Sequence, residues 1–189
     1  MKRAKMLLVL ATFLLGCFAQ KPPRNVGFAR LSTIRDLQGS YENLGEGAKD
    51  NRGVRYLSAV IWPDTNGTGV GRSDIHHASI VTIVVEAVGD TALFVRALRS
   101  DGVEKEETFV RGRDFQFQSG RLLLRRGVNS SIGPDSPILG ASHTSVELGL
   151  DEKGQGKYKM TESAAGLAYL FIPVAGRQTW EVRFVRKDK

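Results

Sequence analysis

The stretch SIVTIVVEAVGDTALFVRALRSDGVEKEETFVR, residues 79–111, decides the fold. It contains three runs rich in aliphatic, β-branched and aromatic residues, and short polar turns separate these runs. The first turn is Gly89-Asp90, and the second contains Asp101-Gly102, a dipeptide typical of tight hairpins. Three such runs in succession predict consecutive antiparallel strands.

The same pattern continues toward the C-terminus. In DFQFQ, residues 114–118, the alternation places Phe115 and Phe117 on one face. In TWEVRFVR, residues 179–186, it does the same for Trp180, Val182 and Phe184, which we therefore expect in the core. The other segments that we expect to form strands are Gly39–Gly45, Arg121–Arg126, Ser145–Asp151, Lys157–Thr161 and Leu167–Val174.

Three segments do not follow the strand pattern. Val54–Trp62 has apolar residues at helical spacing, and Pro63 would end a helix, so we expect one short helix there. Pro63–Asp74 and Gly127–Ser142 are rich in glycine and turn residues, which predicts two long loops. If the domain binds a ligand, these loops are expected to control access to it.

These elements predict a mainly β protein of about 8–10 strands with one short helix. The strands are mostly linked by hairpins, which favours an antiparallel meander. Closing such a sheet removes its unpaired edges, so an up-and-down β-barrel is the preferred architecture and a sandwich is the alternative.

The opening of this domain loosely resembles the lipocalins. Those barrels begin with Gly-x-Trp, and a basic residue on the last strand packs over the Trp ring. This chain has Gly39-Ser40-Tyr41, with Tyr in place of Trp, and Arg183 or Arg186 in the position of the basic residue. The resemblance implies a barrel that carries a small apolar ligand.

The N-terminus is typical of a bacterial export signal. Three basic residues in Met1–Lys5 precede the uncharged run Met6–Gly16, which is too short to span a bilayer. Leu14-Leu15-Gly16-Cys17 then resembles the lipobox of bacterial lipoproteins. The resemblance implies cleavage between Gly16 and Cys17 and attachment of a lipid to the Cys17 thiol, and stable anchoring then takes two acyl chains. The alternative is an ordinary cleaved signal peptide and a free cysteine.

The N-terminal resemblance also sets the expected organisation and location. We expect a signal peptide over residues 1–16, a lipidated N-terminus and tether over 17–38, and a β-barrel-like domain over 39–189. In bacteria similar to the enteric ones, Asp after the lipidated cysteine favours retention at the inner membrane. Phe18 stands there instead, so the expected location is the outer membrane, facing the periplasm.

Composition narrows the class of partner. Cys17 is the only cysteine, which excludes an intramolecular disulfide. The whole chain has a net charge of +7, but three of its basic residues lie in the leader, so the mature chain is only mildly basic. An exported, mildly basic domain is not expected to bind nucleic acid, whereas the membrane is its expected partner.

Candidate catalytic and metal-binding residues are few. His76 and His77 are adjacent, so on a strand they would face opposite ways, and His143 is distant in sequence. A catalytic triad with one of these histidines stays open, although the chain contains no Gly-x-Ser-x-Gly motif. The segment Asp64–Ile75 resembles a calcium loop at Asp64, Asn66, Thr68 and Gly69, but Ile75 stands where a bidentate Glu is required.

The sequence therefore predicts no catalytic, metal-binding or cofactor site. The expected function is a non-catalytic binding or structural module anchored in the cell envelope. The alternative is a lipocalin-like carrier of a small apolar ligand or lipid. An envelope enzyme is the third hypothesis, for which the sequence shows no catalytic pattern.

Overall fold

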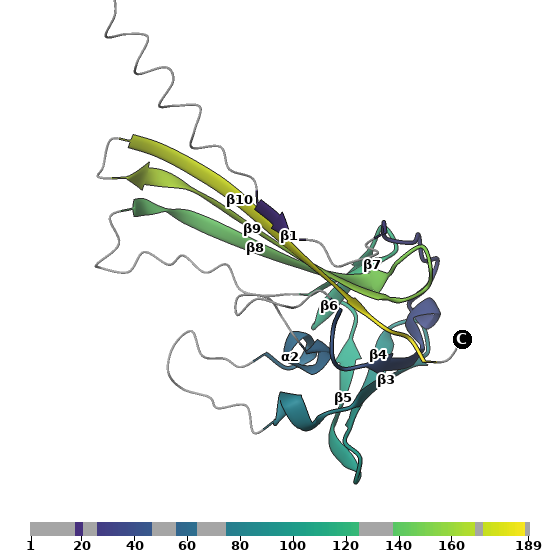
Figure 1. The fold of residues 1–189 in the computed structure, drawn as a ribbon. Coiled ribbons are helices and arrows are strands. Elements are labelled where there is room, and N and C mark those ends of the chain that lie inside the picture. The colour runs from purple at the N-terminus through teal and green to yellow at the C-terminus, as the bar shows by residue number, and fades with distance from the viewer. Residues whose placement is uncertain are drawn as a thin grey trace, which may run out of the picture.

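A computed structural model of the chain describes residues 18–20, 26–46, 56–63, 75–124, 138–168 and 172–187. Over these residues the protein is mainly β, as predicted, and consists of two sheets and three short helices (Figure 1). The ten strands are β1 (Phe18–Gln20), β2 (Gly39–Glu42), β3 (Thr82–Val88), β4 (Ala92–Leu98), β5 (Val103–Val110), β6 (Phe115–Gln118), β7 (Arg121–Leu124), β8 (Ile138–Leu150), β9 (Gly156–Ala168) and β10 (Ile172–Phe184).

The strands form two antiparallel sheets rather than a closed barrel. One sheet has the order β2-β3-β4-β5, and the other has the order β1-β10-β9-β8-β7-β6, in which β1 alone is parallel to its neighbour. Isolated bridges join the sheets at one side, where Tyr41 pairs with Arg186 and Glu46 pairs with Arg183. On the other side, β6 and β7 have four residues each and are too short to continue the pairing along β5. The predicted barrel is therefore wrong, and the alternative, a sandwich, fits the structure.

The stretch that decides the fold behaves as predicted. Each residue of β4 pairs with a residue of β3 on one side and with a residue of β5 on the other. The register with β5 shifts once, between Ala97 and Leu98. Along β4, buried and half-buried residues alternate, and Leu93, Val95 and Ala97 point into the core. Gly89, with a φ of 66°, supplies the left-handed conformation that the β3–β4 turn requires.

One α-helix and two turns of 3-10 helix accompany the sheets. The predicted helix is confirmed as α2 (Leu57–Ile61), which ends before Pro63. The 3-10 helices are η1 (Ile34–Leu37) and η2 (His77–Ser79). Since Ile34 and Leu37 are buried, the compact part of the protein includes residues that precede Gly39.

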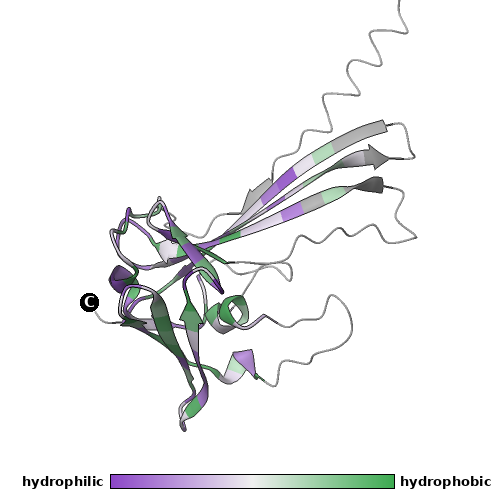
Figure 2. Cartoon of the chain, turned by 180° about the vertical axis from the view of Figure 1, so that it is seen from behind, coloured by the Kyte–Doolittle hydropathy of each residue, from purple (hydrophilic) through white to green (hydrophobic). Residues whose placement is uncertain are grey.

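The last three strands are much longer than the sequence pattern suggests. Strands β8, β9 and β10 have thirteen residues each and pair along their whole lengths. One half of this three-stranded sheet packs in the sandwich, and the other half projects away from it (Figure 1). Figure 2 shows the same projection from behind and shows that the hydrophobic residues of α2 and of the shorter strands gather in the body. We call the projecting half the arm, defined as residues 138–145 of β8, 161–168 of β9 and 172–179 of β10.

The arm accounts for two errors of the sequence analysis. The loop expected over Gly127–Ser142 extends too far, because β8 already begins at Ile138. The strand expected over Leu167–Val174 is instead the end of β9 and the start of β10, with residues 169–171 outside the described part.

The arm also explains why only two of the three β10 residues expected in the core are buried. Val182 and Phe184 are buried in the sandwich, as predicted. Trp180 is only half-buried and lies outside the core cluster, because β10 leaves the body at about this residue.

Candidate functional site

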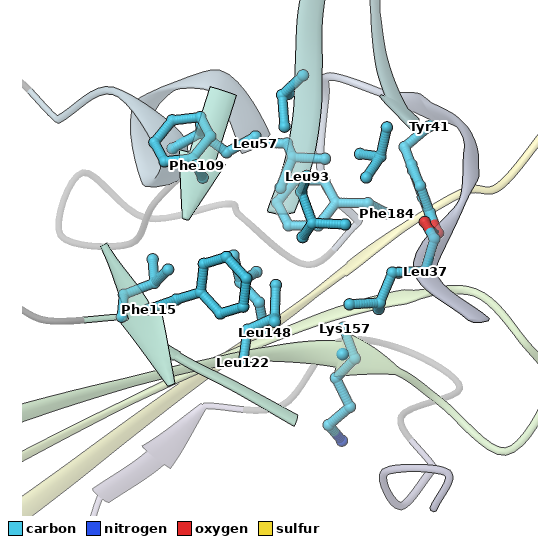
Figure 3. Close-up of a pocket in the computed structure, with 16 residues that line it drawn as sticks. Leu37, Tyr41, Leu57, Leu93, Phe109, Phe115, Leu122, Leu148, Lys157 and Phe184 are labelled. Carbon is cyan, nitrogen blue, oxygen red and sulfur yellow. Dashed lines mark hydrogen bonds between the residues drawn. The ribbon is translucent and has the colours of Figure 1, made fainter. Parts of the chain in front are cut away.

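An apolar cavity of about 90 Å³ lies between the two sheets. Its wall is formed by η1, α2 and every strand from β2 to β10, so that it occupies the centre of the body. Figure 3 shows two groups of side chains that face each other across it, Leu57, Leu93 and Phe109 on one side and Phe115, Leu122 and Leu148 on the other. The remaining lining residues are Leu37, Tyr41, Ile61, Val85, Val95, Leu124, Gly149, Gly156, Lys157 and Phe184.

The two polar side chains of this wall direct their polar atoms to protein partners. The Tyr41 hydroxyl donates a hydrogen bond of 2.7 Å to the carbonyl oxygen of Leu37. The Lys157 side chain extends away from the cavity (Figure 3), and its Nζ lies 2.6 Å from the Val26 carbonyl oxygen and 3.3 Å from a carboxylate oxygen of Glu181. The cavity therefore offers an apolar surface, which favours a hydrocarbon group over a polar or charged one.

On the β9 side of the cavity, the main chain at Gly156 lies close to Tyr41 and Phe184. A Cβ atom at Gly156 would lie 3.1 Å from a ring carbon of Tyr41 and 3.2 Å from the Cβ of Phe184. A side chain at position 156 would therefore require the Tyr41 ring or Phe184 to shift. Gly156 thus lets β9 approach these two residues closely at the cavity wall.

The segment before β2 covers the outer side of the longer sheet. Phe28 forms a bridge with Asp151, and its ring lies 4.4 Å from the guanidinium carbon of Arg121 and 5.1 Å from Nζ of Lys157. Both contacts are of the cation–π type. They hold the N-terminal segment against the strands whose opposite face lines the cavity.

A buried amide holds α2 in place on the other side. Asn43 is fully buried, and its Nδ2 donates to the carbonyl oxygens of His77 and Ile80 at 2.8 and 3.0 Å. Its Oδ1 accepts a hydrogen bond of 2.8 Å from the backbone N–H of Ser58 in α2. Sequence reasoning missed this residue, because a single Asn in a strand end carries no pattern that predicts burial.

A partly buried charge network joins β10 to the segment after β2 and to the β8–β9 turn. Arg183 of β10 donates to Glu46 at 2.6 Å and to Asp151 at 3.3 Å. Burial lowers the pKa of Arg183, but hydrogen bonds and charge interactions with Glu46 and Asp151 outweigh this effect and raise the pKa above its usual value. Asp151 also accepts from the backbone N–H groups of Lys153 and Gln155, so the same carboxylate fixes the β8–β9 turn. The network is structural, and it explains one of the two arginines that the sequence analysis singled out.

The other arginine makes the contact that the lipocalin resemblance implies. The guanidinium carbon of Arg186 lies 5.8 Å from the centroid of the Tyr41 ring. The same guanidinium donates to the carbonyl oxygen of Gln38, directly before the Gly39-Ser40-Tyr41 motif.

The three histidines do not come together. His77 Nδ1 lies 3.0 Å from the Ser58 hydroxyl oxygen, but Ser58 is fully buried and cannot meet a substrate in this arrangement. His76 is exposed beside η2, and His143 is exposed on the arm. Among the described residues, no three His, Cys, Asp or Glu side chains form a group that could hold a metal ion.

Several of the expected features lie outside the described residues. These are the cleavage site at Gly16 and Cys17, the segment Asp64–Asp74 that resembles a calcium loop, and most of the loop expected after Gly127. Phe18 is the first residue that the structure describes. None of the helices in the described part is sufficiently long and apolar to cross a membrane.

Comparison with known proteins gives no relative. The chain matches no protein-family model, no curated protein and no solved structure.

Proposed function

We propose that the protein is a lipid-anchored binding protein of the bacterial cell envelope, whose β-domain holds a small apolar group in its interior. The cavity between the sheets carries this proposal. Its walls are hydrocarbon, and the polar atoms of Tyr41 and Lys157 are engaged with other parts of the protein. A binding module therefore fits the geometry better than a purely structural one, and no catalytic step is part of the proposal.

The size of the cavity limits what it can hold. Apolar cavities of about 150 Å³ stay dry and bind benzene. At about 90 Å³ this cavity is smaller, so it fits the end of an alkyl chain rather than a whole lipid. Fatty acids and phospholipids are the first candidates, because a protein anchored at a membrane is surrounded by their acyl chains.

The anchor is the second part of the proposal. The lipobox-like sequence Leu14-Leu15-Gly16-Cys17 supports cleavage before Cys17 and acylation of its thiol. Phe18 supports transport to the outer membrane, where the domain would face the periplasm. An anchored domain of this kind would carry a small apolar ligand, and the apolar cavity between the sheets supports this part of the proposal.

Native mass spectrometry of the protein purified from its own membranes tests both parts. Wild type is expected to carry the mass of a diacylglyceryl group, and Cys17→Ser is expected to lack it. Equal masses, after allowing for the substitution itself, would refute the anchor. A retained lipid or fatty acid in the wild-type protein is the expected sign of binding.

A matched pair of variants on β3 tests whether binding occurs in the cavity. Val85 lines the cavity, whereas Val84 is on the opposite face of the same strand. Val85→Phe is expected to fill the space and abolish binding, and Val84→Phe is expected to leave it intact. A thermal-shift titration with palmitate measures this, since a ligand at a hundredfold excess over its Kd stabilises the folded state by about 2.7 kcal/mol. If palmitate shifts neither wild type nor Val84→Phe, the proposed binding of acyl chains is wrong.

A further inference from the structure

The arm has no second layer over its described residues. Strand β7 pairs with β8 only at Val146–Leu148, so beyond Val146 the long sheet continues without it (Figure 1). The alanines at 141, 165 and 175 form one row across the three strands, and all of them are exposed. Ala164, on the opposite face of β9, is exposed as well. At these four positions the two faces of the arm are therefore open.

The charges on this sheet stop at a defined level. Glu147, Lys159 and Glu181 form a charged row where the sheet is part of the body. Toward the end of the arm, the last rows with a charged residue contain Glu162 and then Arg177. Beyond Arg177 the strands contain no Asp, Glu, Lys or Arg over residues 138–142, 164–168 and 172–176.

Strand β1 begins at the same level. Strand β1 is parallel to β10, and Phe18 pairs with Gln178, next to Arg177. Because β1 and β10 run from the end of the arm toward the body, the chain enters β1 from the uncharged side. The residue bonded to Phe18 on that side is Cys17. Phe18, the residue that follows the proposed acylation site in sequence, thus lies at the boundary between charged and uncharged rows.

We propose that the uncharged end of the arm is a second membrane contact, which lies in the interfacial layer of the bilayer that holds the lipid on Cys17. This inference rests on the proposed acylation of Cys17. A lipid anchor at this level places residues beyond Arg177 on the membrane side and the charged rows on the aqueous side. A strand rises about 3.3 Å per residue, so the five residues from Arg177 to Ile172 extend about 17 Å beyond the boundary.

The unpaired edges of the arm limit how deep it lies. The outer edge of β8 and that of β10 beyond β1 carry backbone groups that the described strands leave unpaired. Open sheet edges do not occur in the hydrocarbon core, whereas the interfacial layer can hydrate them. The arm is therefore expected to lie tilted among the lipid headgroups rather than to cross the membrane.

Fluorescence of site-specific labels tests this contact. The native thiol is consumed if Cys17 is acylated, so Ala165→Cys introduces the sole free thiol, and Ala78→Cys does the same on an exposed alanine of the body. Each full-length protein is purified from membranes, labelled with an environment-sensitive dye and reconstituted into vesicles of phosphatidylethanolamine and phosphatidylglycerol. The dye at 165 is expected to shift to shorter wavelengths and to be quenched several-fold more by brominated lipid than the dye at 78. Equal quenching at the two sites would overturn the inference.

Two further outcomes separate the possible failures. Wild-type protein that reacts with the dye at Cys17 has no acylated thiol, which refutes the proposed anchor and not the behaviour of the arm. If the dye at 165 is shielded from brominated lipid and the unlabelled Ala165→Cys variant forms disulfide-linked dimers, a second copy covers the arm, and this outcome would overturn the membrane contact.

Charge substitutions give an independent measurement. In a Cys17→Ser background, which has no lipid anchor, Ala165→Asp with Ala175→Asp is expected to reduce co-sedimentation with the same vesicles about tenfold. Ala78→Asp, the same change in the body, is expected to leave it unchanged. Circular dichroism and the melting temperature check that each variant is folded. If the two aspartates leave vesicle binding unchanged, the arm does not contact the membrane.

Discussion

The guanidinium group of Arg186 packs against the ring of Tyr41 and so joins the last residues of the chain to the strand that opens the other sheet. Backbone hydrogen bonds accompany this contact, from Glu42 to the Val185 carbonyl oxygen and from Lys187 to that of Ser40. Arg186 also reaches the carbonyl oxygens of Asp36 and Gln38. A single arginine thereby connects β10, β2 and the segment after η1.

Replacement of this arginine is expected to weaken the junction between the sheets. Arg186→Ala removes the cation–π contact and the hydrogen bonds to Gln38 and Asp36, so we expect the free energy of unfolding to fall by about 1–2 kcal/mol. Urea denaturation measures this. Arg177→Ala, on an exposed residue of β10, is the control and is expected to change the free energy of unfolding by less than about 0.5 kcal/mol. Equal effects of the two changes would contradict the role of Arg186.

The charge network around Arg183 predicts an unequal response of its two acidic partners. Asp151 is almost fully buried and also holds the β8–β9 turn, whereas the Glu46 side chain is 37% exposed. Asp151→Ala removes one of the two carboxylates that pair with the largely buried Arg183 side chain. The free energy of unfolding is therefore expected to fall by about 3–5 kcal/mol. Glu46→Ala is expected to cost markedly less, because water can replace its carboxylate. Equal losses in chemical denaturation would mean that the two carboxylates contribute alike.

Two aromatic residues of β10 separate the body from the arm. Phe184 is fully buried between the sheets, and Phe184→Ala is expected to cost about 3–5 kcal/mol. Trp180 is half-buried at the edge of the body, so Trp180→Ala is expected to cost clearly less. Thermal and urea denaturation of both variants measure the difference. A larger loss for Trp180→Ala would show that this ring is covered in solution.

Asp114, in the turn between β5 and β6, is expected to make the stability of the protein depend on pH. The hydrogen bond from Arg113 is the main cause that lowers the pKa of Asp114, and the backbone N–H of Val110 adds to it, while desolvation acts in the opposite direction. A carboxyl group with a lowered pKa in the folded state stabilises the protein above its unfolded pKa, near 3.9, and this contribution is lost as the pH falls through the folded value.

The Asp114→Asn variant tests this sign. Its melting temperature is expected to lie below that of wild type at pH 7, and the gap is expected to close as the pH falls below about 4. A gap that stays constant down to pH 2 would assign the effect to the geometry of the turn rather than to the charge.

The sequence predicted the short strands well and the long ones badly. In β4, nearly every residue is apolar and turns with Gly89 and Gly102 bound the strand, so the local composition predicts both the strand and its limits. The arm contains runs such as Ser163-Ala164-Ala165-Gly166, in which small residues show no alternation and have little preference for strands. These residues become strand because each is paired with a long neighbour on both sides, which is information about partners that a single segment does not contain.

The cavity was outside the reach of sequence analysis for a related reason. Its walls come from η1, α2 and nine strands, and its volume depends on how their side chains fit together. Alternation predicted that residues such as Phe115 and Phe184 face inward, and they do. Whether inward residues fill the centre or leave space depends on details such as Gly156, whose missing Cβ allows the Tyr41 ring and Phe184 to approach β9 closely.

The pairing of β2 with the end of β10 also determines when the protein can fold. Arg186 and Gln38 are 148 residues apart in sequence, so β2 acquires this neighbour only after all the strands from β3 to β10 have been synthesised. Contacts of such long range form late, because the intervening loop must close before they are gained. The nascent chain thus stays without this junction between the sheets until residue 186 has left the ribosome, and until then the edge of β2 lacks these contacts.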